Sequence, residues 1–197
     1  MFSSQTLLSE TWKSLAGRWI PLLCAIWIAI FCQSILSALP KVGMLVSLVL
    51  SGPFYVGVSS FALGFLRKGD SDWETLIQGF ENPLREILAF LMVTGIVLFG
   101  ILLFIIPGIM WMLSYSQAFF ILADHPEITA SQALRQSQKI MHGHRMDLVK
   151  LHVWQSGLIF LSSLTLFIAL IWLIPYFIIC WARFYEDIKD QTGTVTA

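Results

Sequence analysis

Charged residues are scarce in this sequence. Only 12% of the 197 residues are Asp, Glu, Lys or Arg, and 57% are hydrophobic, whereas about a quarter of the residues in a soluble domain are charged. A soluble domain of this length could not bury so much apolar surface. The 12 basic and 12 acidic residues balance, and no basic stripe could neutralise a row of phosphates. We therefore expect no nucleic-acid partner.

Residues that bind metals or perform catalysis are also rare. Cys24, Cys32 and Cys180 fall in apolar runs without the spacing of a zinc site or a redox motif, and we interpret them as small lipid- or core-facing residues. His142 and His144 have no thiol near them, and zinc needs three or four converging ligands. The GxSxG and HExxH motifs do not occur. We expect no metal site, no cofactor and no enzymatic activity.

Hydrophobic runs, by contrast, fill most of the chain. Six of them are long enough to cross a bilayer or nearly so, at residues 20–39, 42–66, 87–106, 108–123, 151–168 and 169–182. They predict an all-α polytopic membrane protein. We expect a helical bundle of about six transmembrane helices, arranged as three hairpins with short cytoplasmic interfacial helices. Five crossings, or a re-entrant segment, remain as alternatives.

Turn signals divide the longest runs. Pro107-Gly108 interrupts a run that is far too long for one helix, so we expect the chain to reverse there. The stretch 151–182 fits two short spans with a turn near Ile168–Leu173. Gly52-Pro53 predicts a kink or a helix restart within the second run.

These patterns predict one integral-membrane domain over residues 1–197. Its expected parts are a cytoplasmic amphipathic lead at 1–18, hairpins at 20–66, 87–123 and 147–188, an interfacial segment at 70–82, an interfacial helix at 129–143 and a flexible tail at 189–197. The polar lead is too long for a signal peptide, so we interpret the first run as a retained span.

The cations indicate the orientation. Eleven of the twelve Lys and Arg residues fall before the first span, at 67–85, at 135–150 or after 182, and only Lys41 lies in another connection. With six spans, all eleven lie on one side, which the positive-inside rule makes cytoplasmic. We expect a bacterial cytoplasmic (inner) membrane protein with both termini in the cytoplasm.

The segment 129–143 carries the signals of a short amphipathic helix. Thr129 and Gln132 form a T-x-x-Q capping box, and Gly143 suits the end of the helix. At 100° per residue, Arg135 and Lys139 share one face, opposite the more apolar face formed by Ala130, Ala133, Leu134, Ser137, Ile140 and Met141. We expect the helix to lie along the cytoplasmic interface, as a structural connector or as a docking surface for lipid or protein.

Two groups of polar residues are candidate sites. Gln117 and Gln155 lie at similar depths in two predicted spans, about 10 Å and 12 Å inward of the nearest Asp, and His152 lies nearer the surface. They predict interhelical hydrogen bonds or a polar cavity. The spans contain no deeply placed charged residue, which counts against an ion-coupled carrier. The candidate cytoplasmic docking or ion-pair residues are Asp124, Arg135, Lys139, Arg183 and Glu186.

Several stretches resemble a known family. They are SGPFYVGVSSFALGFLRKG (51–69), GFEN (79–82), FIIPGIMWMLSYSQAFFILADHPEITASQALRQSQKIMHGHR (104–145) and PYFIICWARFYEDI (175–188). Over about 50–188 the chain resembles the bacterial multi-pass membrane proteins grouped as domain of unknown function 975. It is also distantly similar to the membrane region of some glycerophosphodiester phosphodiesterases, although their catalytic barrel is absent here. The resemblance implies a topology and no biochemical activity.

Three classes of function follow from these features. The favoured one is a non-enzymatic scaffold or modulator that acts through its cytoplasmic face on a protein partner or a lipid. A small carrier or lipid-translocating protein with a polar cavity between helices is the alternative, and an intramembrane enzyme has no motif to support it. The expected partners are membrane lipids and a membrane or cytoplasmic protein, with a second copy of the chain as a further candidate.

Overall fold

The structure of the chain is a computed structural model that describes residues 11–12, 15, 19–69, 73–165 and 167–192. Within these residues every regular element is helical, which confirms the all-α prediction. Four helical stretches are long and apolar enough to cross a membrane. They are α2 (Trp19–Ser37), α3 (Gly43–Lys68), α5 (Pro83–Leu103) and the stretch Ile105–Asp124, which comprises α6 and α7. Most of the predicted lead at 1–18, and residues 193–197 of the predicted tail, lie outside the described residues.

The first hairpin forms where the sequence predicts it. Helices α2 and α3 are joined by a short turn in which Lys41 has a positive φ of 70°. The side chain of Gln33 in α2 donates hydrogen bonds to the Ser47 carbonyl (2.8 Å) and to the Ser51 hydroxyl (3.0 Å) in α3. Of the two alternatives predicted at Gly52-Pro53, a kink or a restart, the restart was wrong, because α3 continues as one helix through Pro53.

The second hairpin reverses earlier than expected. The backbone is extended at Phe104, between α5 and α6 (Ile105–Tyr115), and the turn at Pro107-Gly108 was therefore wrong. Pro107 instead lies in the first turn of α6, where a missing N–H leaves no intrahelical bond unmade. Gly100 and Gly108 let the two helices approach closely: a Cβ on Gly108 would collide with the Ile101 backbone. Helix α7 (Ala118–Asp124) follows after a break at Ser116–Gln117.

The segment before α5 does not lie at the end of α3. Its helices α4 (Glu74–Ile77) and η1 (Gln78–Phe80) pack against the middle of α3. A Cβ on Gly57 would collide with the Leu76 carbonyl, and one on Gly79 with the Pro53 carbonyl. Gly57 lies eleven residues before the end of α3, about 16 Å along its axis. Helices α4 and η1 therefore lie alongside α3 rather than beyond its end, and Gly79 allows the close contact between them.

Helix α8 (Ala130–Ile140) confirms its predicted signals. The Thr129 N–H donates to Gln132 Oε1 (2.8 Å) and the Gln132 N–H donates to Thr129 Oγ1 (3.4 Å), which completes the capping box. Gly143 has a φ of 93°, which suits a glycine after a helix end. The Ser137 hydroxyl donates to the Ser114 carbonyl (2.8 Å), so the buried face of α8 packs on α6.

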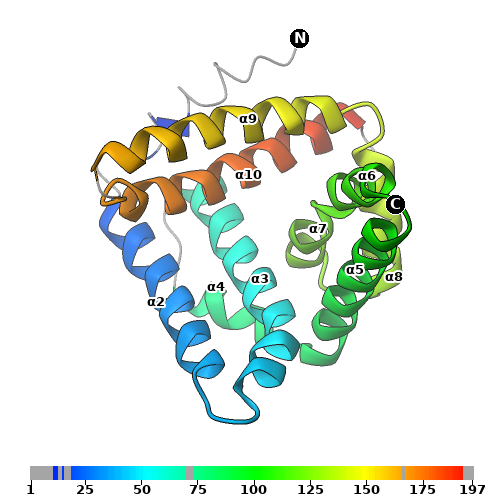
Figure 1. The fold of residues 1–197 in the computed structure, drawn as a ribbon, viewed down its shortest axis with the longest axis horizontal. Helices are drawn as coiled ribbons and strands as arrows, with labels where there is room; N and C mark the ends of the chain where they lie inside the picture. Colours follow the sequence, from blue (N-terminus) through cyan, green and yellow to red (C-terminus); the bar gives the residue numbers. More distant parts are fainter. Residues whose placement is uncertain (1–10, 13–14, 16–18, 70–72, 166, 193–197) are drawn as a thin grey trace.

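The last two helices cross the first hairpin. Helices α9 (Arg145–Ser162) and α10 (Leu170–Thr192) lie side by side and run in opposite directions (Figure 1). The Trp27 indole, about 12 Å into α2, donates to the Ile171 carbonyl (3.1 Å). Fifteen residues later, Glu186 reaches the end of α3 through Arg67. Helix α10 therefore crosses the hairpin obliquely rather than running parallel to it.

The connection between α9 and α10 also differs from the prediction. It comprises η2 (Ser163–Thr165) and the residues up to Ala169, a few residues before the expected turn. Neither α9 nor α10 is among the four candidate spans, so the six-span arrangement is not confirmed. Helix α10 extends to Thr192, so the predicted flexible tail begins within a helix.

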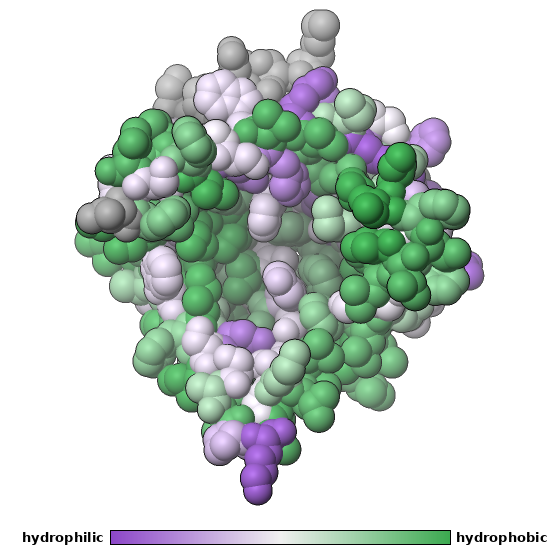
Figure 2. Space-filling model, viewed as in Figure 1, coloured by the Kyte–Doolittle hydropathy of each residue, from purple (hydrophilic) through white to green (hydrophobic). Residues whose placement is uncertain are grey.

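Apolar side chains cover much of the surface. Figure 2 shows hydrophobic residues over both flanks of the visible face, with hydrophilic and intermediate ones along its middle, in its upper part and at its lower tip. At the end of the second hairpin, Leu102, Phe104 and Ile106 are each more than two-thirds exposed. A contiguous apolar surface of this kind is typical of proteins that contact lipid or another protein.

The glycines of α3 provide a test of the fold. We expect Gly57→Val to lower the free energy of unfolding by about 1–3 kcal/mol, because the added side chain overpacks the contact with Leu76. Thermal unfolding in detergent, followed by tryptophan fluorescence, would measure the change. Gly95→Val is the matched control, since no atom lies within 4 Å of a Cβ there. Equal effects of the two substitutions would contradict the described packing.

Candidate functional site

A group of charged side chains surrounds Asp124, the last residue of α7. Arg67 Nη1 donates to Asp124 Oδ1 (2.6 Å), and the Tyr185 hydroxyl donates to Oδ2 (3.0 Å). Lys189 Nζ donates to the same oxygen. Arg67 also donates to Glu186 Oε1, from Nε (2.9 Å) and Nη2 (2.6 Å). These five residues, which we call the Asp124 cluster, join α3, α7 and α10.

Local helical geometry presents these side chains to one another. Arg67 lies in the last turn of α3, where a cation is favoured by the helix dipole. Glu186 and Lys189 are three residues apart on α10, and Tyr185 lies four residues before Lys189, so the three side chains share one face of that helix. Asp124 ends α7 between the two longer helices, and its side chain is only 6% exposed.

The Asp124 cluster is electrically balanced. Arg67 and Lys189 each carry a positive charge, and Asp124 and Glu186 each carry a negative one. Both oxygens of the buried Asp124 carboxylate accept hydrogen bonds from the cluster, as a buried charge requires. The group therefore acts as an electrostatic clamp between three helices, with no spare charge on Asp124 for an external ion.

The sequence indicated only part of this cluster. It predicted that Asp124 and Glu186 would take part in ion pairs at one face, and the structure brings them together through Arg67. Arg183, another of the candidate docking or ion-pair residues, is partly buried on α10 and is not one of the five. The spacing of Tyr185 and Lys189 from Glu186 places all three on one face of a helix, and it could have predicted that they belong to the same cluster. Nothing in the sequence pairs Arg67 of α3 with the end of α7.

A second polar feature lies beside the Asp124 cluster, where the guanidinium of Arg85 caps α7. Its Nη2 lies 3.3 Å from the Leu122 carbonyl, and its Nη1 donates to the Pro126 carbonyl. The contact with Leu122 satisfies a carbonyl that the end of the helix leaves without a partner, and the contact with Pro126 fixes the turn that follows. Arg85 also lies beside the buried Glu86 (3.4 Å). The sequence reasoning did not single out either residue.

Arg85 lines a small polar cavity between α3, η1, α5 and α7. The cavity has a volume of about 140 Å³. Its polar lining comes from Ser60, Gln78, Glu81, Asn82 and Arg85. These residues would suit a small polar solute or ordered water rather than a hydrocarbon chain.

The predicted polar trio is divided between two places. The Trp181 indole in α10 donates to Gln155 Oε1 (3.1 Å) and stacks on the His152 ring at 5.7 Å, so these two residues of α9 share one partner. Gln117 lies between α6 and α7, and its amide donates to the Ser116 hydroxyl (3.3 Å). Gln117 and Gln155 are both buried. None of the three lines the polar cavity beside Arg85.

The two predicted cations of α8 lie on its exposed face. Arg135 and Lys139 are both exposed, whereas the opposite face is fixed to α6 by the hydrogen bond from Ser137. Among the residues that the structure describes, no group of three His, Cys, Asp or Glu side chains is arranged to hold a metal ion.

A family model described as "Protein of unknown function (DUF975)" matches residues 18–192 of the chain. No curated protein and no solved structure matches it. The comparisons do not show the distant similarity to glycerophosphodiester phosphodiesterases.

Removing the charge of Asp124 tests the clamp. We expect Asp124→Asn to lower the free energy of unfolding by about 1.5–3 kcal/mol, the usual contribution of a hydrogen bond to a charged group, because Arg67 and Lys189 lose their shared carboxylate. Thermal unfolding in detergent measures the loss. Glu127→Gln is the control, since Glu127 is 67% exposed and its change should stay within about 0.5 kcal/mol. A similar stability of both variants would exclude the clamp.

Proposed function

The chain belongs to the family of proteins of unknown function whose model it matches, and we propose that it is a membrane scaffold or modulator. In this proposal it lies in the bacterial inner membrane and acts through its cytoplasmic face on a protein partner or a lipid. Three hairpins that all enter the membrane from the same side would leave both termini in the cytoplasm. The exposed cationic face of α8 is the observation that carries the proposal.

The construction of α8 supports a docking role. Its capping box and its hydrogen bond to α6 hold the helix in a defined position, so that a partner would meet a pre-formed surface. Arg135 and Lys139 are four residues apart on the exposed face, a spacing that brings the two charges together. By contrast, the cations Arg67 and Lys189 are engaged within the Asp124 cluster. The face of α8 therefore suits an acidic protein segment or anionic lipid headgroups.

The membrane placement is supported by the distribution of apolar surface. Four helical stretches have the length and composition of spans. Exposed apolar residues also cover the hairpin of α9 and α10, at Phe160, Leu164, Phe167, Ile168 and Trp172. A hairpin with such a tip would be stable in lipid, which supports its insertion as the third hairpin.

A polar cavity favours the second candidate function, a small carrier. The cavity beside Arg85 has polar groups from three helical segments, and a carrier would need such a site to alternate between the two sides of the membrane. This cavity involves other residues than the predicted Gln117, His152 and Gln155.

Reversing the charge of α8 tests the scaffold. We expect the double substitution Arg135→Glu/Lys139→Glu to reduce strongly the amount of partner that is retained. Each cation near an anionic surface contributes about 1 kcal/mol to the free energy of binding. Native mass spectrometry of protein extracted gently from its own membrane would compare retained subunits or lipids. Lys41→Glu, in the other connection, is the control. Unchanged retention in the double variant would contradict docking on α8.

Thiol labelling of variants that lack the native cysteines tests both the topology and the carrier. We expect Ser131→Cys on α8 to react with a membrane-impermeant maleimide only from the cytoplasm, and Lys41→Cys only from outside. The opposite pattern would overturn the orientation. Ser60→Cys in the polar cavity distinguishes the two functions. A scaffold predicts labelling from the cytoplasm alone or none, whereas a carrier that alternates predicts labelling from both sides.

A further inference from the structure

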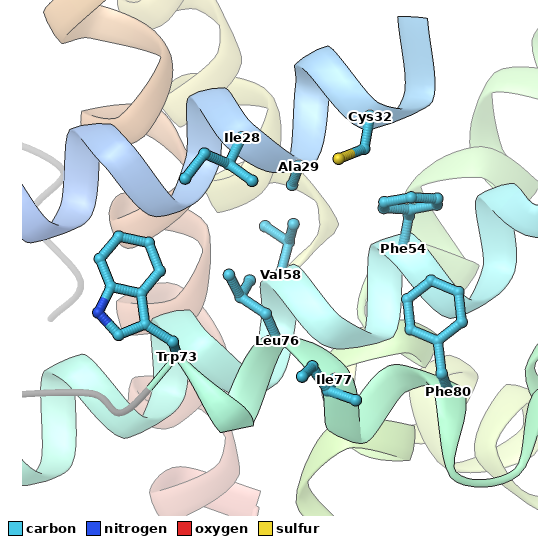
Figure 3. Close-up of a pocket in the computed structure, with 9 residues that line it drawn as sticks. All are labelled: Ile28, Ala29, Cys32, Phe54, Val58, Trp73, Leu76, Ile77 and Phe80. Carbon is cyan, nitrogen blue, oxygen red and sulfur yellow. The ribbon is translucent and has the colours of Figure 1, made fainter. Parts of the chain in front are cut away.

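An apolar pocket lies between α2, α3 and the segment formed by α4 and η1. It has a volume of about 190 Å³, somewhat larger than the cavity of about 150 Å³ that holds a benzene molecule in an engineered protein core. Figure 3 shows Ile28 and Ala29 from α2 on one side, Phe54 and Val58 from α3 below them, and Trp73 at one end. No charged residue lines the pocket.

We propose that this pocket binds the distal part of one acyl chain of a membrane phospholipid. The inference rests on the placement of α2 and α3 in a membrane, and it concerns a site separate from the cationic face of α8. Because both neighbouring helices could span a bilayer, the medium at the open side of the pocket is hydrocarbon. An acyl chain is the apolar molecule that this medium supplies.

The depth of the pocket agrees with the depth of a chain end. Ile28 and Cys32 lie about 14 Å and 20 Å from the first residue of α2, and Val58 and Phe54 lie about 15 Å and 21 Å from the end of α3. The two helices therefore give the same depth independently. The hydrocarbon core of a bilayer is about 30 Å thick, so the pocket lies near its middle, where acyl chains of a leaflet end.

Aromatic side chains shape the two ends of the pocket. Phe54 and Phe80 form an edge-to-face pair with ring centroids 5.2 Å apart, and together with Cys32 they form the end of the pocket farthest from Trp73 (Figure 3). The side chains of Trp73 and Ile77 are about half and two-thirds exposed. They leave an entrance from the surrounding medium, so a chain could enter sideways without unfolding of the segment.

A positive charge lies where the headgroup of such a lipid would be. Lys68 is exposed in the last turn of α3, about 15 Å along the axis from Val58. At 100° per residue, Lys68 lies within about 40° of Phe54 around the helix, whereas Arg67 lies opposite Val58. Arg67 accordingly faces the Asp124 cluster, and Lys68 is left on the side of the pocket. A phosphate at the membrane surface and a cation at this position are complementary.

Photocrosslinking in vesicles tests the proposal. The full chain is reconstituted in phosphatidylcholine vesicles that contain a trace of phosphatidylglycerol with a diazirine in the distal half of one acyl chain. We expect adducts on the peptide that contains Trp73 and Phe80 to exceed those on the exposed Leu98–Leu102 segment of α5 by about fivefold. That ratio corresponds to about 1 kcal/mol of preference.

Matched variants identify the pocket as the cause. Cys32→Trp fills the pocket from its rim and should remove the excess of adducts on the peptide with Trp73 and Phe80. Cys24→Trp, at an exposed position on the same helix, should leave this excess unchanged. Thermal unfolding of both variants confirms that they fold. If Cys32→Trp does not fold, Ala29→Leu replaces it. Lys68→Gln should reduce the excess with phosphatidylglycerol, and Lys41→Gln should not.

Three results would overturn the inference. Equal labelling of the pocket and of α5 would show a lipid contact without a site. If the excess of adducts persists after the pocket is filled, the acyl chain binds at another place. No adducts on α2, α3 or α5 would contradict the membrane placement itself, and with it both this inference and the proposed scaffold. If the α8 variants lose their partner but still form the normal number of lipid adducts in the pocket, the two sites act independently.

Discussion

The close packing of backbone against backbone along α3 is the contact on which the rest of the structure depends. Gly52 meets the Glu86 carbonyl, and Gly57 meets the Leu76 carbonyl, at positions where any side chain would collide. Gly79 in turn meets the backbone of α3 at Pro53 and Gly57. In a bilayer apolar side chains gain little from leaving lipid, so helices associate mainly through such close contacts between small residues.

This packing determines where the neighbouring features can form. Because of this packing, the segment of α4 and η1 lies against the middle of α3. The two sides of the segment then present different residues. Trp73 and Phe80 face the apolar pocket between α2 and α3, while Gln78 contributes to the polar cavity beside Arg85. It also sets the start of α5 beside α3, so that Arg85 can reach the end of α7. One row of glycines thus separates an apolar site from a polar one.

The Asp124 cluster adds a second, electrostatic constraint at the end of α3. Its charges compensate one another, which makes it suited to holding α3, α7 and α10 together rather than to binding an ion. The surfaces available for interaction are then of two kinds. Helix α8 presents cations on a fixed polar face, and the pocket beside α2 presents an apolar space. A scaffold that joins a bound lipid to a cytoplasmic partner would use both.

Composition and local patterns predicted the helical class and much of the hairpin organisation. Helix α8 is the best example, because a capping box and a polar face are local features that need no tertiary partner. The first hairpin was also predicted from its two long apolar runs, although the proline in the second run was interpreted as a kink or a restart. The turn at Phe104 was missed because proline was interpreted as a helix breaker, whereas in the first turn of a helix it costs no hydrogen bond.

The sequence by itself therefore determined the all-α class, the four apolar stretches that are long enough to cross a membrane and the capped polar helix, since each depends on residues near one another in the chain. Only the tertiary structure decided that α4 and η1 pack at the middle of α3, that α10 crosses the first hairpin obliquely and that Arg67 joins Asp124 to Glu186. These features depend on which backbones can approach closely and which charges then meet. Such contacts link residues as far apart as Arg67 and Glu186, and no local pattern records them.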